Sequence, residues 1–251
     1  MQLRTLARDC LYLNWALPLE AAPKLPAPLR YELHSWKEAE WVFASALLFR
    51  HSGLQLKTMP FPRVSYPQMN LRLYVFDGAG MPAVLFVCML VPPWVVPVSR
   101  LMGRQPAAAA GFSYPSPTRQ SPEESWSWTI RRRRRLEVAA RVASPQVGYG
   151  PPLGSWERTV DYFRNRRLGY VEWEGRLRAI RTSHPAAEVW PLAVELGEVD
   201  LVSNCLGDIG ADALRSPHSA WLCPEIPFIF ELGKSMALPL APQRVPAAEG
   251  C

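Results

Sequence analysis

The sequence predicts a mainly β protein (α+β) with a few short helices, and three observations lead to this expectation. Proline is abundant, at 26 of 251 residues, and an interior proline removes a backbone donor and clashes with the preceding helical turn. From Gln68 to Val75 polar and apolar residues alternate, which is typical of a strand with two unlike faces. The turn Asp77–Gly80 contains two glycines, which suit a hairpin. Many short strands joined by rigid corners are therefore expected, and long helices are excluded.

The first half of the chain is expected to be extended. Apolar, β-branched and aromatic residues predict strands at 10–17, 29–33, 39–49, 70–76 and 83–90. The stretch 53–67 contains three prolines and is expected to be a loop. One helical turn is expected at 99–102, and an irregular, alanine-rich crossover at 105–117.

The second half combines strands with the best helix of the chain. A hairpin is expected from 126–135 and 136–142, and further strands at 168–173, 176–182 and 189–196. Between them, Ser155–Arg166 has an N-capping serine, and Trp156, Val160 and Phe163 recur at helical spacing. The chain shows no internal repeat and no linker, so a single domain over 1–237 is expected, followed by a disordered tail at 238–251.

Composition and cysteine usage bound the compartment and the partners. The formal net charge is +6 with a pI near 9.2, which favours anionic partners without bearing on the fold. The five cysteines form no Cys-x-x-Cys pair, so free thiols in a reducing compartment are expected, and no metal site or cofactor is. The N-terminus has no signal-peptide core, and the longest apolar run, 83–98, is interrupted by prolines. A cytoplasmic protein without a membrane span is the expectation.

Several segments, taken in order, carry a family resemblance. They are 11–15 with Pro18, 66–75, Arg100 with 103–106, 129–135, 163–170, the pair His184-Pro185, and 190–192. Together they resemble the uncharacterised bacterial family called domain of unknown function 2071, which is placed in the acetoacetate decarboxylase superfamily. The matches span roughly residues 5 to 235. The resemblance implies an acetoacetate-decarboxylase-like, mostly antiparallel and highly curved β-barrel with a central cavity and a few short helices.

The superfamily also implies a chemistry from which this chain departs. In acetoacetate decarboxylase a lysine with a depressed pKa forms a Schiff base with a β-keto acid. The resemblance would place that lysine in the crossover 103–110, which here reads Gly-Arg-Gln-Pro-Ala-Ala-Ala-Ala and contains no amine. Gln68 stands on the strand where a catalytic carboxylate would be expected, and an amide does not ionise. An amine-dependent decarboxylase is therefore not expected.

The alternating strand provides the first candidate binding residues. Arg72 is the leading one, because a buried guanidinium needs a carboxylate from the protein or from a ligand. Asn70, Tyr74 and Gln68 lie on the same face and could orient a small acid. Two alternatives stay open: this face is outside and solvated, or Arg72 pairs with an internal carboxylate such as Glu231.

Two further candidates come from the crossover and from a strand end. Arg104, with Gln105 beside it, stands where the superfamily keeps its chemistry, and the alternative for Arg104 is an exposed turn. His184 precedes a proline and could act as a general base. We favour instead a strand-end histidine that is hydrogen-bonded to the backbone, since no Asp or Ser partner can be assigned to it.

The sequence therefore favours a protein that binds a small organic anion through Arg72, with Asn70, Tyr74 and Gln68 orienting it and Arg104 at the rim. It leaves open whether the protein is an enzyme and whether it forms a homo-oligomer. The alternative function is non-catalytic binding of nucleic acid or protein through Arg131–Arg135. Nucleic acid is the less favoured partner, because no recognised binding module accompanies this run and alternate side chains of a strand point to opposite faces.

Overall fold

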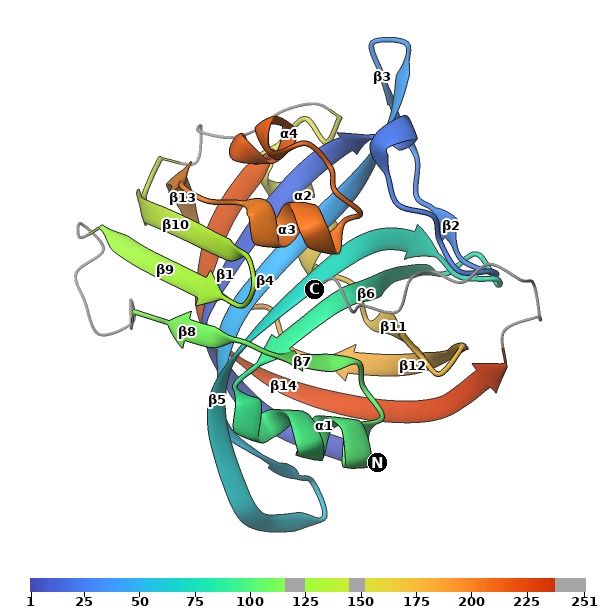
Figure 1. Cartoon of the computed structure of the whole chain (residues 1–251), viewed down its shortest axis with the longest axis vertical. Helices are drawn as coiled ribbons and strands as arrows, with labels where there is room; N and C mark the ends of the chain where they lie inside the picture. The colour runs from blue at the N-terminus through green and yellow to red at the C-terminus, as the bar shows by residue number, and fades with distance from the viewer. Residues whose placement is uncertain (116–124, 145–151, 238–251) are drawn as a thin grey trace.

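The computed structural model describes residues 1–115, 125–144 and 152–237. Within them, seven strands form a strongly curved ring (Figure 1). They are β1 (Gln2–Pro18), β4 (Ala39–Leu56), β5 (Met59–Phe76), β6 (Pro82–Val91), β11 (Leu168–Trp173), β12 (Arg176–Ser183) and β14 (Ser219–Ala237). The ring closes because β1 pairs with β4 on one side and with β14 on the other. Neighbours in the ring are antiparallel except β6 and β11, which run parallel.

A second row of strands extends from β14 as an arm. Its order is β13 (Trp190–Leu196), β10 (Arg135–Val142), β9 (Trp126–Arg131) and β8 (Gly111–Ser113). Three short strands pair with ring strands: β2 (Arg30–Tyr31) with β5, β3 (His34–Trp36) with β4, and β7 (Ala107–Ala109) with β6. The expected mainly β, highly curved fold is confirmed, although the ring with its arm is not a regular barrel.

The helices are short, as expected. They are η1 (Leu19–Ala21), η2 (Pro93–Val95), α1 (Val96–Gly103), α2 (Trp156–Arg164), α3 (Asp200–Cys205) and α4 (Ala211–Arg215). α2 begins where the sequence predicted, because the Ser155 side chain accepts a hydrogen bond from the Arg158 N–H at 3.3 Å. The buried side chains of Val160 and Phe163 pack inside the ring with Tyr74, so α2 fills part of the ring interior.

Alternation along each strand divides the core into two parts. On β5, Leu71 and Leu73 belong to a cluster that also holds residues of β9, β10 and α3. Tyr74 belongs to the cluster inside the ring, with Tyr12 of β1. The polar face of β5 is therefore directed into the ring, and the arm covers the apolar face, so both faces of this strand are buried.

Two segments differ from the sequence-based expectation because prolines occupy strand edges. The region 53–67 was expected to be a loop, but β4 and β5 run through it as a long hairpin with β-bulges. Between Met59 and Gln68, β5 pairs with β4 alone, since β6 pairing begins only at Met69. A free edge tolerates proline, because no ladder hydrogen bond is lost there.

The same explanation holds for β14, which the sequence did not predict. Pro224 and Pro227 discourage a strand assignment. They lie between the part of β14 that pairs with β13, at Trp221–Leu222, and the part that pairs with β12, which begins at Ile229. β1 pairs along the other edge. The crossover 105–117 likewise contains β7 and β8, and the predicted tail 238–251 lies outside the described residues.

None of the described helices has the length and apolar character needed to cross a membrane.

Candidate functional site

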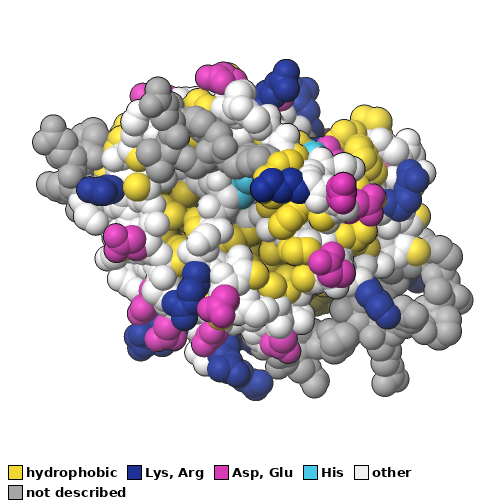
Figure 2. All heavy atoms as spheres, turned by 90° about the horizontal axis from the view of Figure 1, so that it is seen from above, with side chains coloured by type: hydrophobic (Ala, Val, Ile, Leu, Met, Phe, Trp, Pro, Cys, Tyr) yellow, Lys and Arg dark blue, Asp and Glu magenta, His cyan; other side chains and the backbone are white. Residues whose placement is uncertain are grey.

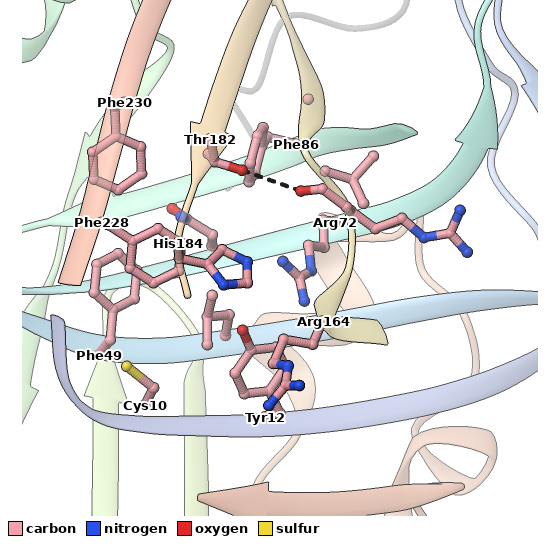
Figure 3. Close-up of a pocket in the computed structure, with 15 residues that line it drawn as sticks. Cys10, Tyr12, Phe49, Arg72, Phe86, Arg164, Thr182, His184, Phe228 and Phe230 are labelled. Atoms are coloured by element: carbon pink, nitrogen blue, oxygen red, sulfur yellow. Dashed lines mark hydrogen bonds between the residues drawn. The ribbon is translucent and has the colours of Figure 1, made fainter. Parts of the chain in front are cut away.

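A cavity of about 50 Å³ lies inside the ring (Figure 3). Every ring strand and the C-terminal end of α2 contribute to its wall. The apolar part is formed by Leu47, Phe49, Val84, Phe86, Phe228 and Phe230. Its main polar side chains are Asn70, Arg72, Arg164, Arg166, Thr182 and His184. Since a single water occupies about 10–15 Å³ on this measure, the cavity has room for a ligand of only a few non-hydrogen atoms.

Arg72 carries a buried positive charge in this wall. Its Nη2 donates to the Phe163 carbonyl oxygen at 3.1 Å, while its Nε is buried without a hydrogen-bond partner. The guanidinium carbon lies 5.2 Å from the ring centre of Tyr12 and 5.5 Å from that of Tyr74, within cation–π range. Among the described residues no carboxylate forms an ion pair with Arg72, and Glu231 is exposed on β14.

Two further arginines lie at the end of α2. Arg166 has its Nη2 at 2.9 Å from a Glu32 carboxylate oxygen, so its charge is compensated. Arg164 donates from Nη1 to the Ala187 carbonyl at 2.8 Å, and its Nε is buried without a partner. Within the described part of the chain, Arg164 has no carboxylate in ion-pair range. The cavity wall therefore has an excess of positive charge.

The sequence analysis did not select Arg164 or Arg166, because basic residues near a helix end commonly interact with solvent and with the last carbonyls of the helix. The helical spacing of the sequence did contain a signal for both arginines. Arg164 follows Val160 by four residues and Arg166 follows Phe163 by three, which places both on the buried face of the helix or its continuation.

His184 follows the last residue of β12. Its position is compatible with both interpretations, a strand-end histidine bonded to the backbone and a residue of the site. Its Nδ1 lies 3.0 Å from the Pro185 carbonyl oxygen, as expected for a histidine held at a strand end. It also lines the cavity, with its ring 4.8 Å from that of Phe228. Because a carbonyl only accepts, Nδ1 is the donor of this contact, and in the corresponding tautomer the lone pair is on Nε2.

The other predicted residues of β5 lie in or directly behind the wall. Asn70 lines the cavity, and its Oδ1 accepts a hydrogen bond from Gln68 Nε2 at 2.7 Å. The Oε1 atom of Gln68 lies 3.2 Å from Nε2 of His51, a residue that the sequence analysis did not select. Tyr74 donates its hydroxyl to the same Phe163 carbonyl that Arg72 uses, at 3.1 Å.

Arg104 lies elsewhere. It is the exposed C-cap of α1, with a φ of 46°, and its N–H donates to the carbonyl oxygen of Arg100. It is not among the residues that line the cavity. The exposed-turn alternative describes this position.

Burial keeps the Cys10 thiol and the Tyr12 hydroxyl of the wall neutral. The pKa of the Cys10 thiol is raised by burial and by the neighbouring Cys223. The pKa of the Tyr12 hydroxyl is likewise raised, because burial outweighs the attraction of Arg72. Neither group supplies a negative charge at neutral pH that would compensate Arg72.

The hairpin with Arg131–Arg135 is present, but none of these five arginines lines the ring cavity. Arg135 pairs with Glu137 at 2.7 Å and with Glu198 at 3.3 Å, and Asp200 also borders the hollow at the turn. On the face seen from above, Lys and Arg side chains are interspersed with Asp and Glu (Figure 2). The basic charge is thus partly offset at the hairpin and scattered on this face.

Comparison with known proteins identifies the family of the chain. The model of domain of unknown function 2071, described as an uncharacterized conserved protein, matches residues 5–226. The chain belongs to this family. No protein with a curated description matches it in sequence.

Solved structures share the fold of this family member at low sequence identity. An acetoacetate decarboxylase-like enzyme from Sphingomonas wittichii RW1 superimposes with a TM-score of 0.59 at 13% identity, covering 95% of this chain and 94% of that one. The enduracididine biosynthesis enzyme MppR, solved in complex with pyruvate, gives a TM-score of 0.56 at 14% identity, with coverage of 95% and 91%. The ring is therefore an acetoacetate-decarboxylase-like fold.

Proposed function

We propose that the protein binds a small organic anion in the ring cavity, with Arg72 as its principal contact. The observation that carries the proposal is the state of this side chain, which is buried, has an unpartnered Nε and forms no ion pair in the described part of the chain. Removing a cation from water costs several kcal/mol, and a fold retains such a group at lower cost when a counter-ion joins it. A ligand carboxylate is the counter-ion that we propose.

The size and lining of the cavity support a short-chain acid. The volume of about 50 Å³ admits a few non-hydrogen atoms, and phenylalanine side chains cover much of the wall. The related fold of MppR has been solved with pyruvate, a three-carbon oxo acid. A small oxo acid is therefore the first ligand class to test.

We propose no Schiff-base chemistry for this site. Among the described residues, those that line the cavity include no lysine, and Lys24, Lys37 and Lys57 are exposed. If a reaction takes place in the cavity, the Nε2 atom of His184 is the proton acceptor that we assign to it, because Nδ1 of the same ring lies 3.0 Å from the Pro185 carbonyl oxygen. A lyase or hydrolase acting on a small acid without a covalent amine would have this form.

The test compares pyruvate binding by calorimetry to wild type, Arg72→Met and Arg104→Met. A charge-assisted hydrogen bond contributes about 1.5–3 kcal/mol, so Arg72→Met should bind about 10- to 150-fold more weakly. Arg104→Met makes the same chemical change at an exposed site and should bind like wild type. Unaltered affinity in Arg72→Met would contradict the proposal.

Two further measurements complete this comparison. Arg72→Met removes an unpaired buried charge, so it should stay folded. Its unfolding free energy should fall by no more than the contribution of one hydrogen bond. Native and denaturing mass spectra of the protein as purified should differ by the mass of a retained anion if binding is tight. Equal masses would restrict the proposal to weak ligands.

A further inference from the structure

A chain of hydrogen bonds connects a buried histidine to the cavity wall. Nδ1 of His51 on β4 lies 3.3 Å from the Thr5 hydroxyl oxygen on β1, and its Nε2 lies 3.2 Å from Gln68 Oε1 on β5. Gln68 Nε2 in turn lies 2.7 Å from Asn70 Oδ1. All four side chains are buried, and only Asn70 lines the cavity. The chain therefore runs through the ring wall and ends at the cavity.

The donor and acceptor chemistry of the four side chains gives this row of hydrogen bonds a direction. An amide oxygen only accepts, so His51 Nε2 must carry the hydrogen that Gln68 Oε1 receives. His51 Nδ1 is then an acceptor for the Thr5 hydroxyl. The amide nitrogen of Gln68 donates to Asn70 Oδ1, which occupies the acceptor of Asn70. Its amide nitrogen has no hydrogen-bond partner among the described residues and remains for the cavity.

The surroundings of His51 keep the imidazole neutral, so only one of its two nitrogens carries a hydrogen. The rings of Phe49 and Tyr66 lie 4.8 Å from the imidazole, and that of Phe230 lies 5.9 Å away. Burial in this aromatic environment lowers the pKa of His51 to about 4. With one hydrogen present, the tautomer of His51 decides which way every amide behind it points.

We propose that His51 and Gln68 are positioning residues that hold the Asn70 carboxamide with its N–H group towards the ligand. The site would then take a carboxylate at Arg72 together with an uncharged acceptor oxygen, such as an oxo group, at Asn70. This inference rests on the proposed anion binding. The reversed chain, in which the Thr5 hydroxyl donates to the Ser52 carbonyl at 3.4 Å, would present the Asn70 oxygen instead.

The first test reads the tautomer without any ligand. Nitrogen-15 NMR of histidine-labelled protein, with the signals of His51 assigned by their loss in His51→Gln, should show a neutral imidazole protonated at Nε2. A ring protonated at Nδ1 would overturn the proposal, because the chain would then run in the opposite direction. This result does not depend on whether the protein binds pyruvate, so it separates the inference from the proposed function.

The second test measures selectivity between two acids of equal carbon number. Wild type should bind pyruvate about tenfold more tightly than propionate, which lacks the oxo acceptor and leaves the Asn70 donor unpaired. His51→Leu and Gln68→Met each interrupt the row of hydrogen bonds and should reduce this ratio towards one, because pyruvate loses more affinity than propionate does. His51→Gln retains an N–H donor towards Gln68 and should keep the preference.

The outcomes separate clearly. An unchanged pyruvate-to-propionate ratio in a folded His51→Leu or Gln68→Met protein would refute the positioning role. Failure of wild type to bind either acid would count against the proposed function, and the NMR result would still decide the direction of the chain.

Discussion

Burial of neutral His51 should make the protein lose stability as the solution becomes mildly acidic. The pKa of His51 is lowered by burial from its usual 6.5 to about 4. Between these two values the unfolded chain takes up a proton that the folded protein does not, so acid favours unfolding. The contribution is fully present above pH 6.5 and is lost as the pH falls towards 4.

The size of the effect follows from the two pKa values. A separation of about 2.5 pKa units corresponds to about 3 kcal/mol of unfolding free energy in total, of which about 2 kcal/mol is lost between pH 7 and pH 5. Other shifted groups also titrate there. The pKa of His34 is lowered by burial and by Arg166, and that of Glu32 is raised by burial. A comparison with a variant of His51 alone cancels their contributions.

The assay is urea unfolding at pH 7 and at pH 5, followed by tryptophan fluorescence, for wild type and His51→Gln. Glutamine keeps a hydrogen-bond donor and has no titration in this range. On going from pH 7 to pH 5, wild type should therefore lose about 2 kcal/mol more unfolding free energy than His51→Gln. A difference that stays constant with pH would refute the reasoning, because it would mean that His51 is already charged or exposed.

Two further predictions concern the cavity wall. A Cβ at Gly169 would lie 2.5 Å from the Phe86 ring, so Gly169→Ala should displace that ring, cost about 1–3 kcal/mol of stability and weaken pyruvate binding in calorimetry; equal affinity would show that the ring moves elsewhere. Glu32→Gln leaves Arg166 without its carboxylate, so chemical denaturation should show a loss of about 3 kcal/mol. Asp212→Asn, which breaks an exposed ion pair, should change stability by less than about 1 kcal/mol, and equal effects of the two variants would contradict the importance of burial.

Much of the fold was predictable from local patterns. The alternation from Gln68 to Val75 predicts a strand, and Ser155 with its apolar periodicity predicts α2. What alternation could not supply is which face lies inside. Both faces of β5 are buried, one by the ring interior and one by the arm. That arrangement depends on segments far away in the sequence.

The errors have a common physical cause. Proline signals a break only where the backbone N–H is needed, and Pro224 and Pro227 lie where the neighbouring edge of β14 is free. The site shows the same limit. Arg72 and Asn70 follow from the polar face, whereas Arg164 reaches the cavity wall and His51 contacts Gln68 only when α2 and β4 are brought against β5.

The closure of the ring has a consequence for how the chain acquires its cavity. β1 contains the first described residues and pairs along its length with β14, which contains the last, so that Gln2 lies opposite Glu231. Contacts between such distant segments form slowly, because the intervening chain must be ordered first. During synthesis the hairpins of β4, β5 and β6 are complete long before β14 emerges. The ring that encloses Arg72 is closed only when β14 pairs with β1 and β12, so we expect the cavity to form late in folding.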